Sequence, residues 1–199
     1  GNAGAFKGEL KDNIAEVRSL DIKNQQIKRR SLKDCKFEYR SSVFKKGDGE
    51  EEIVISAVLK LKKGNKKDIK NQIKEKIEYR KNRHPLEYPN VGSIFKNIPT
   101  FAKASAGKPT QRIPAAILDE FRSSIKNDPF PVLPTAKLLA AAGLKGKKQA
   151  GAMVSQKHPN FIVNLNNASS ADVKTLIYKL KKIIKDKYNL ELEEEITII

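Results

Sequence analysis

One stretch, residues 88–97, organises the rest of the chain, and it reads YPNVGSIFKN. The proline fixes the backbone at the entry, and Gly92 permits a tight turn or a close approach to a ligand. Ser93, Lys96 and Asn97 then place a hydroxyl, an ammonium and an amide within one short span. Such a segment can hold a polar ligand. Serine and asparagine are also ordinary turn residues, so a capped turn that leads into a strand is the competing interpretation.

The composition limits the classes of protein to consider. The chain has 199 residues and a formal charge of +17. It is long enough for one large or two small domains with a real core. The lysine excess favours anionic partners, but acidic residues are interleaved with it and no arginine-rich arm is present, which favours a solvated lysine-rich surface. No apolar run is long enough to cross a bilayer.

Single residues give further limits. Cys35 is the only cysteine, which excludes an internal disulfide and a thiolate metal cluster and fits a reducing compartment. The two histidines, His84 and His158, are far apart in the sequence, so we expect no metal site. The chain begins with Gly1 and its only methionine is Met153, so we expect coding sequence upstream. The lack of a signal peptide here therefore says nothing about the parent protein.

Hydrophobic periodicity predicts the elements. Alternation predicts strands, and apolar residues three or four apart predict helices. The predicted strands are 14–22, a short one through Ile27, 53–61 buried in a sheet, 161–164 and 190–199. The predicted helices are 65–80, 115–126, 136–142 capped by Thr135, and one that follows a capping box at residues 169–172. Residues 47–49 and 100–114 are predicted loops. This order predicts an α+β fold, in which the last strand returns to the first sheet.

Four separated polar groups stand out. Arg40 can present a planar fork to a carboxylate or phosphate. Ser93 and Lys145 lie in glycine-containing turns. Three consecutive acids, residues 193–195, are unfavourable in a strand unless one has a partner or a task, although a solvated edge explains them equally well. The small residues 1–9 can approach a phosphate or a flat ring, or form a flexible terminus.

The order and context of these groups resemble one family, the UDP-N-acetylenolpyruvoylglucosamine reductases, also called UDP-N-acetylmuramate dehydrogenases. Each matching motif is weak alone, but they follow the family order almost from end to end. The motifs are Asn2-Ala3-Gly4-Ala5 with Gly8-Glu9; Cys35, Phe37, Tyr39-Arg40, Ser42 and Phe44-Lys45; Gly92-Ser93 with Phe95-Lys96-Asn97; Gly143-Leu144-Lys145-Gly146; Gly151-Ala152 with Val154-Ser155; Asn166-Asn167-Ala168; Asp172-Val173; and Leu192-Glu193-Glu194-Glu195.

The resemblance covers the later two-thirds of the family, in the form without an extra tyrosine-bearing substrate loop. It implies that residues 1–82 and 189–199 are the remainder of a second FAD-binding domain, and that residues 83–188 are an inserted α+β substrate-binding domain. It also implies a cytoplasmic enzyme of peptidoglycan synthesis, with a monomer expected. The cofactors would be FAD and NADPH, and the substrate would be UDP-N-acetylglucosamine enolpyruvate. No metal, nucleic-acid or membrane partner is expected.

The resemblance also implies residue roles. Ser93 would donate a proton to the substrate, Arg40 would stabilise the enolate charge, and Glu195 would be the acid–base partner. Asn97 and Lys145 would contact the diphosphate and sugar region, with His158 as a third substrate-binding residue. The segment Asn2, Ala3, Gly4 and Ala5 would lie against FAD.

Departures from the family pattern concern loop geometry more than chemistry. Asn90 stands where serine is usual, Ile98 follows Asn97 where proline is common, Ala150 replaces a common glycine, and the stretch 100–126 is longer than expected. Two alternatives remain open. One is a flavin-free fragment that binds a UDP-sugar weakly or not at all, and the other is a basic nucleic-acid-binding domain whose affinity falls steeply with salt.

Overall fold

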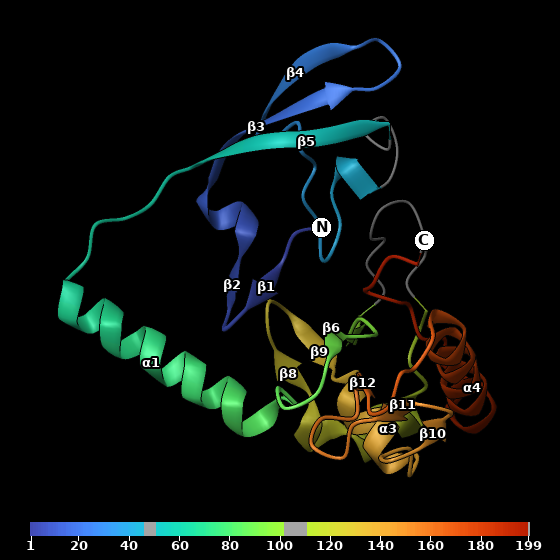
Figure 1. Cartoon of the computed structure of the whole chain (residues 1–199). Helices are drawn as coiled ribbons and strands as arrows, with labels where there is room; N and C mark the ends of the chain where they lie inside the picture. The colour runs from blue at the N-terminus through green and yellow to red at the C-terminus, as the bar shows by residue number, and fades with distance from the viewer. Residues whose placement is uncertain (46–50, 102–110, 199) are drawn as a thin grey trace. The chain divides into compact units, whose positions relative to one another are not determined.

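A computed structural model describes residues 1–45, 51–101 and 111–198, and its helices and sheets form an α+β fold, as predicted (Figure 1). Two compact units share the described residues. The described residues of the first unit are 1–45, 51–63 and 127–130. Those of the second unit are 64–101, 111–126 and 131–198. The predicted loop 47–49, and residues 102–110 of the predicted loop 100–114, lie outside the described residues.

The first unit is built on antiparallel strands. A short hairpin precedes a three-stranded sheet in the order β4-β3-β5, in which β3 is central. The elements are β1 (Gly4–Ala5), β2 (Gly8–Glu9), the 3-10 helix η1 (Leu10–Asn13), β3 (Ile14–Asp21), β4 (Gln26–Ser31), η2 (Val43–Lys45) and β5 (Glu52–Leu59). The strands predicted at 14–22 and through Ile27 are confirmed.

The strand β5 lies close to the predicted bounds 53–61, but the prediction that it is buried is wrong. Ile53 and Val58 are 55% and 51% exposed. The reason is position, because β5 is an edge strand that pairs with β3 alone within the described sheet. Register shifts against β3 also interrupt the alternation of the two faces.

The buried face of β3 is mostly polar. Val17, Ser19 and Asp21 alternate on it, and only Val17 belongs to an apolar cluster, together with Ile14 and Cys35. The apolar core of the first unit is therefore small, and the polar remainder of this face must be satisfied by hydrogen bonds and ion pairs.

The second unit contains four α-helices and two small sheets among its described residues, with strand orders β10-β11-β12-β6 and β7-β9-β8. Its elements are α1 (Lys66–Arg83), β6 (Asn90–Ser93), β7 (Ile98–Pro99), α2 (Ala115–Glu120), η3 (Arg122–Ser124), β8 (Lys126–Asn127, whose second residue belongs to the first unit), β9 (Pro131–Leu133), α3 (Thr135–Ala141), β10 (Lys148–Gln149), β11 (Ala152–Val154), β12 (Phe161–Asn164) and α4 (Ser170–Tyr188).

The helix α4 anchors the core of this unit. Its buried residues Leu176, Leu180 and Ile184 recur at helical spacing and join a cluster that includes Phe95 and Leu138. The predicted capping box is present, because the Ser169 hydroxyl accepts from the amide of Asp172 and the Asp172 carboxylate accepts from the amide of Ser169. Sequence and packing agree here, so this helix was the most predictable element.

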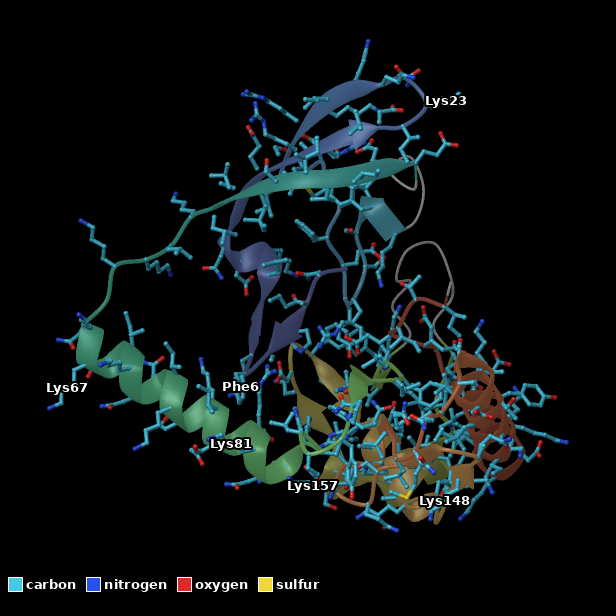
Figure 2. All side chains as sticks on the ribbon, viewed as in Figure 1. Phe6, Lys23, Lys67, Lys81, Lys148 and Lys157 are labelled. Carbon is cyan, nitrogen blue, oxygen red and sulfur yellow. The ribbon has the colours of Figure 1, made fainter. Side chains whose placement is uncertain are left out.

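The helix α1 begins where predicted but buries no residue. Asn65 caps it by accepting from the amides of Lys67 and Asp68. The apolar stripe of Ile69, Ile73 and Ile77 is 44–52% exposed. Lysines lie along the rest of the helix, and Figure 2 shows Lys67 and Lys81 extending away from it.

Two predicted helices differ from those observed. The helix predicted at 115–126 stops at Glu120 and is followed by the short 3-10 helix η3 and strand β8. Thr135 is not the cap of α3 but its first residue, since Pro134 occupies the cap position. The Thr135 hydroxyl instead donates to the main-chain oxygen of Lys96.

The strand predicted at 190–199 is also wrong for the described residues 190–198. Leu190 and Leu192 are buried in the core of the second unit, and within the described part of the segment the only bridge is between Glu194 and Phe95. A ladder needs a partner of matching length, whereas the backbone–backbone hydrogen bonds of this segment, among the described residues, join it to Ile94 and Lys96. The segment therefore packs within the second unit instead of returning to the first sheet.

Candidate functional site

Ser93 stands at the end of the edge strand β6. Asn90 orders the entry, because its side-chain amide donates to the oxygens of Pro85 and Tyr88 and its side-chain oxygen accepts from the amide of Gly92. Gly92 has a φ of +86°, which favours glycine. The stretch 88–97 is thus both a turn and a strand, and it presents Ser93 opposite Phe161 of β12.

The next residues, 94–96, form a strip that is hydrogen-bonded on both edges. On one edge, the Asn160 main-chain oxygen accepts from the amide of Ile94 at 2.8 Å. On the other edge, the amide of Lys96 donates to the oxygen of Glu193 at 2.9 Å, and the amide of Glu195 donates to the oxygen of Ile94 at 2.8 Å. Ser93 and Glu195 are therefore brought together through the same strip.

The three closing acids have different surroundings. Glu193 pairs with Lys96 at 2.6 Å, and Glu194 pairs with Lys181 at 2.8 Å. Glu195 is half-buried beside Ile94. Of the interpretations that the sequence left open, a partner applies to two of the three acids, and in both cases the partner is a lysine.

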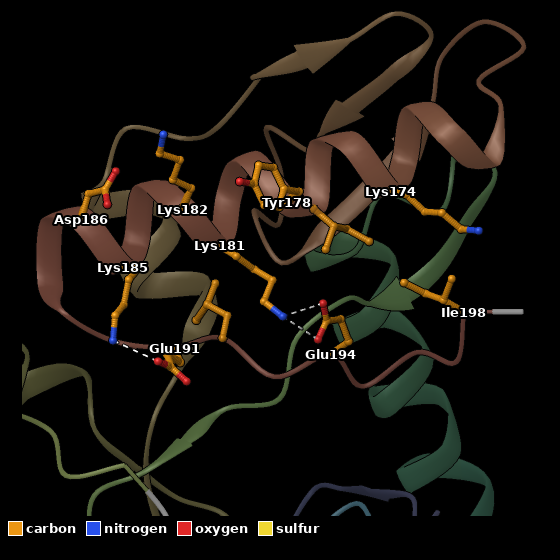
Figure 3. A pocket seen from close by; sticks show the side chains of 11 residues that line it. Lys174, Tyr178, Lys181, Lys182, Lys185, Asp186, Glu191, Glu194 and Ile198 are labelled. Carbon is orange, nitrogen blue, oxygen red and sulfur yellow. Dashed lines mark hydrogen bonds and ion pairs between the residues drawn. The ribbon is translucent and has the colours of Figure 1, made fainter.

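A groove lies between α4 and the closing segment, and Figure 3 shows its lining. Its volume is about 570 Å³. Lys181 and Lys185 reach across it to Glu194 and Glu191, so these ion pairs tie the closing segment to the helix. The ion pairs are surface-exposed or nearly so, and each contributes only a few tenths of a kcal/mol up to about 1 kcal/mol.

Asn97 and Lys145 lie at two other turns of the second unit. The side-chain oxygen of Asn97 accepts from the amide of Thr135 at 3.2 Å, which fixes its amide at the start of α3. Lys145 is exposed in the turn between α3 and β10, which Gly143 and Gly146 form with φ values of +72° and +73°. Glycine suits both positions because side chains rarely adopt this backbone conformation.

His158 lies in an aromatic cluster with His84 and Phe161. The ring centroids of His158 and Phe161 are 4.8 Å apart, and those of the two histidines are 5.5 Å apart. Burial, and secondarily the positive charge of His84, lower the pKa of His158 to about 4. Its Nδ1 is buried and has no hydrogen-bond partner among the described residues. Near neutral pH this imidazole is uncharged and can only accept or donate a neutral hydrogen bond.

Arg40 lies in the first unit, against the predicted cofactor-binding segment. Its guanidinium donates to the main-chain oxygens of Asn2 at 3.4 Å and Gly4 at 2.7 Å. A Cβ on Gly4 would come within 2.8 Å of Arg40 Nη1, so glycine leaves the room that this contact requires. Arg40 itself has a φ of +52°, an uncommon conformation for a side-chain-bearing residue.

The side chain of Asn2 is already committed inside the first unit. It is fully buried, donates to Glu9 at 2.9 Å and accepts from the amide of Lys11 at 3.0 Å. Ala3 and Ala5 are exposed and Gly4 is half-buried. This segment can thus offer small side chains and backbone to a flat ligand, while Asn2 holds it in place.

Two polar residues of the second unit were missed from the sequence. Asn160 is 4% exposed, and its side chain donates to Phe95 O at 2.8 Å and accepts from Phe95 N at 3.1 Å. Thr135 is fully buried between Lys96 and Asn97. The only available signal was a polar residue directly beside a predicted strand or helix, which is common in any protein.

Comparison with known proteins decides the family. The C-terminal domain of UDP-N-acetylenolpyruvoylglucosamine reductase matches residues 84–199. The chain belongs to the UDP-N-acetylenolpyruvoylglucosamine reductase family. The family resemblance seen in the sequence is therefore confirmed.

Relatives of the same name match the whole chain. The UDP-N-acetylenolpyruvoylglucosamine reductase of Caldanaerobacter subterraneus is 35% identical over 100% of this chain and 54% of its own length. That of Enterococcus faecalis is 34% identical over 100% of this chain and 54% of its length. The chain thus spans about half the length of the reductases that it matches.

A solved structure has the same fold. The crystal structure of the UDP-N-acetylenolpyruvylglucosamine reductase of Thermus caldophilus aligns with a TM-score of 0.67 and 26% identity, over 98% of this chain and 56% of that one. Separately, no helix within the described residues is long and apolar enough to span a bilayer.

Proposed function

We propose that this chain forms part of an enzyme that reduces UDP-N-acetylglucosamine enolpyruvate to UDP-N-acetylmuramate, with FAD as cofactor and NADPH as electron source. Membership of the reductase family supports the reaction. The observation that carries the site is the strip 94–96, which ties Ser93 and Glu195 to each other by main-chain hydrogen bonds. This reaction belongs to peptidoglycan precursor synthesis, as the family resemblance implies.

The domain assignment is part of the same proposal. The first unit would supply the FAD-binding part and the second unit the substrate-binding part. The sequence-based boundaries, 1–82 with 189–199 against 83–188, differ from the compact units at three described places: α1, the closing segment, and residues 127–130, which belong to the first unit.

The small residues at the start of the first unit support flavin binding in this proposal. The small side chains of Ala3 and Ala5 would lie against the flavin. Because Gly4 has no side chain, the Arg40 guanidinium has room to donate to the Gly4 oxygen. Bound FAD would supply hydride chemistry: it would accept a hydride from NADPH and pass it to the enolpyruvyl double bond. The other roles fall to side chains of this chain.

Arg40 would balance the negative charge that develops at the substrate carboxylate, since a guanidinium stays protonated and can bind a carboxylate through two donors. The Ser93 hydroxyl would give a proton to the neighbouring carbon, and Glu195 would support it as the acid–base partner. Among the described residues the Ser93 hydroxyl makes no hydrogen bond, which is compatible with such a transfer.

Substrate binding would fall to Asn97, Lys145 and His158. The exposed Lys145 ammonium suits a diphosphate. The amide of Asn97 is fixed by Thr135 and suits a sugar hydroxyl or phosphate oxygen. The neutral His158 would contribute a hydrogen bond without charge.

The test measures the two half-reactions separately in the protein expressed from its complete gene. We expect bound yellow flavin, and we expect Ser93→Ala to keep flavin reduction by NADPH while slowing substrate reduction about 10²-fold. Glu195→Gln should behave similarly, and Glu194→Gln is the matched control because its partner is Lys181. Wild-type protein without flavin, or Ser93→Ala with normal substrate reduction, would contradict the proposal.

The 199-residue chain should be tested beside it. Flavin absorbance in this shorter protein would place a sufficient binding site within it. Its absence, with flavin present in the longer protein, would leave the short chain as a fragment that binds at most the UDP-sugar.

A further inference from the structure

Asn160 contacts the strip 94–96 in the way that a neighbouring strand would. Strand β12 pairs with β6 at Phe161 and Ser93, and regular pairing ends there. One residue further, the side-chain amide of Asn160 both donates to Phe95 and accepts from it, while the Asn160 main chain accepts from Ile94. The carboxamide thus replaces a peptide group and continues the ladder past the end of the strand.

The burial of this residue shows that the arrangement is specific. A buried amide is costly unless both its N–H and its oxygen are paired. Asn160 is 4% exposed and satisfies both groups on the single residue Phe95, which is 1% exposed. An apolar residue here would leave the N–H and oxygen of Phe95 without these partners in the interior.

The opposite edge of the strip carries the closing segment. Glu195 donates its amide to Ile94, and Ser93 is covalently joined to Ile94. A shift in the backbone of Ile94 and Phe95 would therefore also move the backbone of Ser93 and Glu195. It would change the distance between the two side chains if the two residues did not move equally. Asn160 is the buried side chain that hydrogen-bonds to this strip at Phe95, next to Ile94.

We propose that Asn160 is a positioning residue that sets the placement of the Ser93 hydroxyl relative to the Glu195 carboxylate. Because this role presupposes the proposed reductase reaction, the experiment must distinguish the two. Asn160 touches neither substrate nor cofactor in this role and acts through the backbone of residues 94 and 95.

A second buried residue offers a matched comparison. Thr135 holds the other end of the same segment, through the oxygen of Lys96 and the side chain of Asn97. Asn97 is assigned to substrate binding, whereas Ser93 and Glu195 are assigned to proton transfer. The Thr135 hydroxyl donates to the oxygen of Lys96, next to Asn97, while the bond to the Asn97 side chain comes from the main-chain amide of Thr135 and survives in Thr135→Val. Loss of the hydroxyl should therefore disturb the backbone beside Asn97 and raise KM more than it lowers kcat, and loss of the Asn160 amide should do the reverse.

The decisive variant is Asn160→Asp, compared with wild type and Thr135→Val in protein expressed from its complete gene. A carboxylate keeps the acceptor for Phe95 N but cannot donate to Phe95 O. We expect substrate reduction to slow about 10²-fold at pH 8, which is the loss that a small misplacement of catalytic groups can cause. Flavin reduction by NADPH should stay within about 2-fold of wild type, because Ser93 and Glu195 serve only the later step.

A shift in pH tests whether the lost donor to Phe95 causes the deficit, and the restriction of the deficit to substrate reduction separates positioning from a general structural loss. A protonated aspartic acid has nearly the shape and the donor–acceptor pattern of the amide. The deficit of Asn160→Asp in substrate reduction should therefore shrink as pH falls toward about 5, whereas that of Thr135→Val should not. Asn160→Ser, which carries no charge, provides the comparison if Asn160→Asp does not fold, and its deficit should not depend on pH.

Each outcome bears on a different claim. Substrate reduction by Asn160→Asp and Asn160→Ser at the wild-type rate, with active wild type, would overturn the positioning role alone. A wild-type protein that binds no flavin and reduces no substrate would overturn the proposed function and this role with it. A pH-dependent deficit confined to substrate reduction would support both.

Discussion

Glu52 illustrates how single residues stabilise the first unit. Its carboxylate is 1% exposed, and it accepts hydrogen bonds from Ser19, Arg30 and Lys28. The Arg30 guanidinium, followed by these hydroxyl and ammonium donors, lowers the pKa of Glu52 to about 2. The polar residues on the buried face of β3 are therefore the centre of a paired network.

Removing the charge of Glu52 should destabilise the chain in a pH-dependent way. Because its folded-state pKa lies below the ordinary value, its contribution is complete above about pH 5 and is lost as pH falls toward about 2. At pH 7 we expect Glu52→Gln to cost about 3 kcal/mol, since it leaves Arg30 partly buried and unpaired. Near pH 2.5 the difference from wild type should be much smaller. Urea unfolding across this range measures it.

Glu78→Gln is the control for that measurement. Glu78 pairs with Lys81 on the surface of α1, and its side chain is 51% exposed. Its removal should change the free energy of unfolding by less than about 0.5 kcal/mol at any pH. A cost for Glu52→Gln that is equally small at pH 7 would show that the network contributes little to stability.

Residue type predicted some contacts in the site and not others. Gly92 could be assigned to a turn because its positive φ is a property of the backbone. For residues 193–195 the sequence left a partner, a task and a solvated edge open, and it did not indicate that Lys96 and Lys181 pair with Glu193 and Glu194. Asn160 could not be found, since its role depends on Phe95, which is 65 positions away in the chain. A contact of that range leaves no local pattern.

At the scale of elements, α4 shows which features local sequence determines. Its capping box and the spacing of its apolar residues are both local, and both were predicted. The burial of β5 was not, because whether a strand is central or at an edge depends on the rest of the sheet. The strands β7 to β11 have two or three residues each. Such short strands show too little alternation of apolar and polar residues to be predicted from the sequence.

The cap of α4 gives a prediction at this scale. Ser169→Ala removes the acceptor for the amide of Asp172 and one half of the capping box. We expect a loss of about 1 kcal/mol in the free energy of unfolding. Ser170→Ala is the matched control, because this serine is exposed at the first position of the helix and should be nearly neutral. Urea unfolding followed by circular dichroism compares the two, and equal losses would contradict the assigned cap.

At the scale of the whole molecule, the two units differ in the size of their apolar cores. Counted over the described residues, the cluster in the second unit contains nineteen buried residues, whereas the cluster in the first contains three, Ile14, Val17 and Cys35. Burial of apolar surface is the main favourable term in folding. The first unit instead relies on the Glu52 network and on main-chain hydrogen bonds in its sheet.

This difference predicts unequal local stability. In native-state hydrogen exchange of the 199-residue chain, the amides of β3 should open at a lower free energy than those of α4 around Leu180. Leu180→Ala should cost about 2–5 kcal/mol and lower protection in α4 more than in β3, because Leu180 is buried in the larger cluster. Val17→Ala should have the opposite pattern. Equal opening free energies for β3 and α4, with both variants lowering them in parallel, would mean that the units unfold as one and that core size does not set their stability separately.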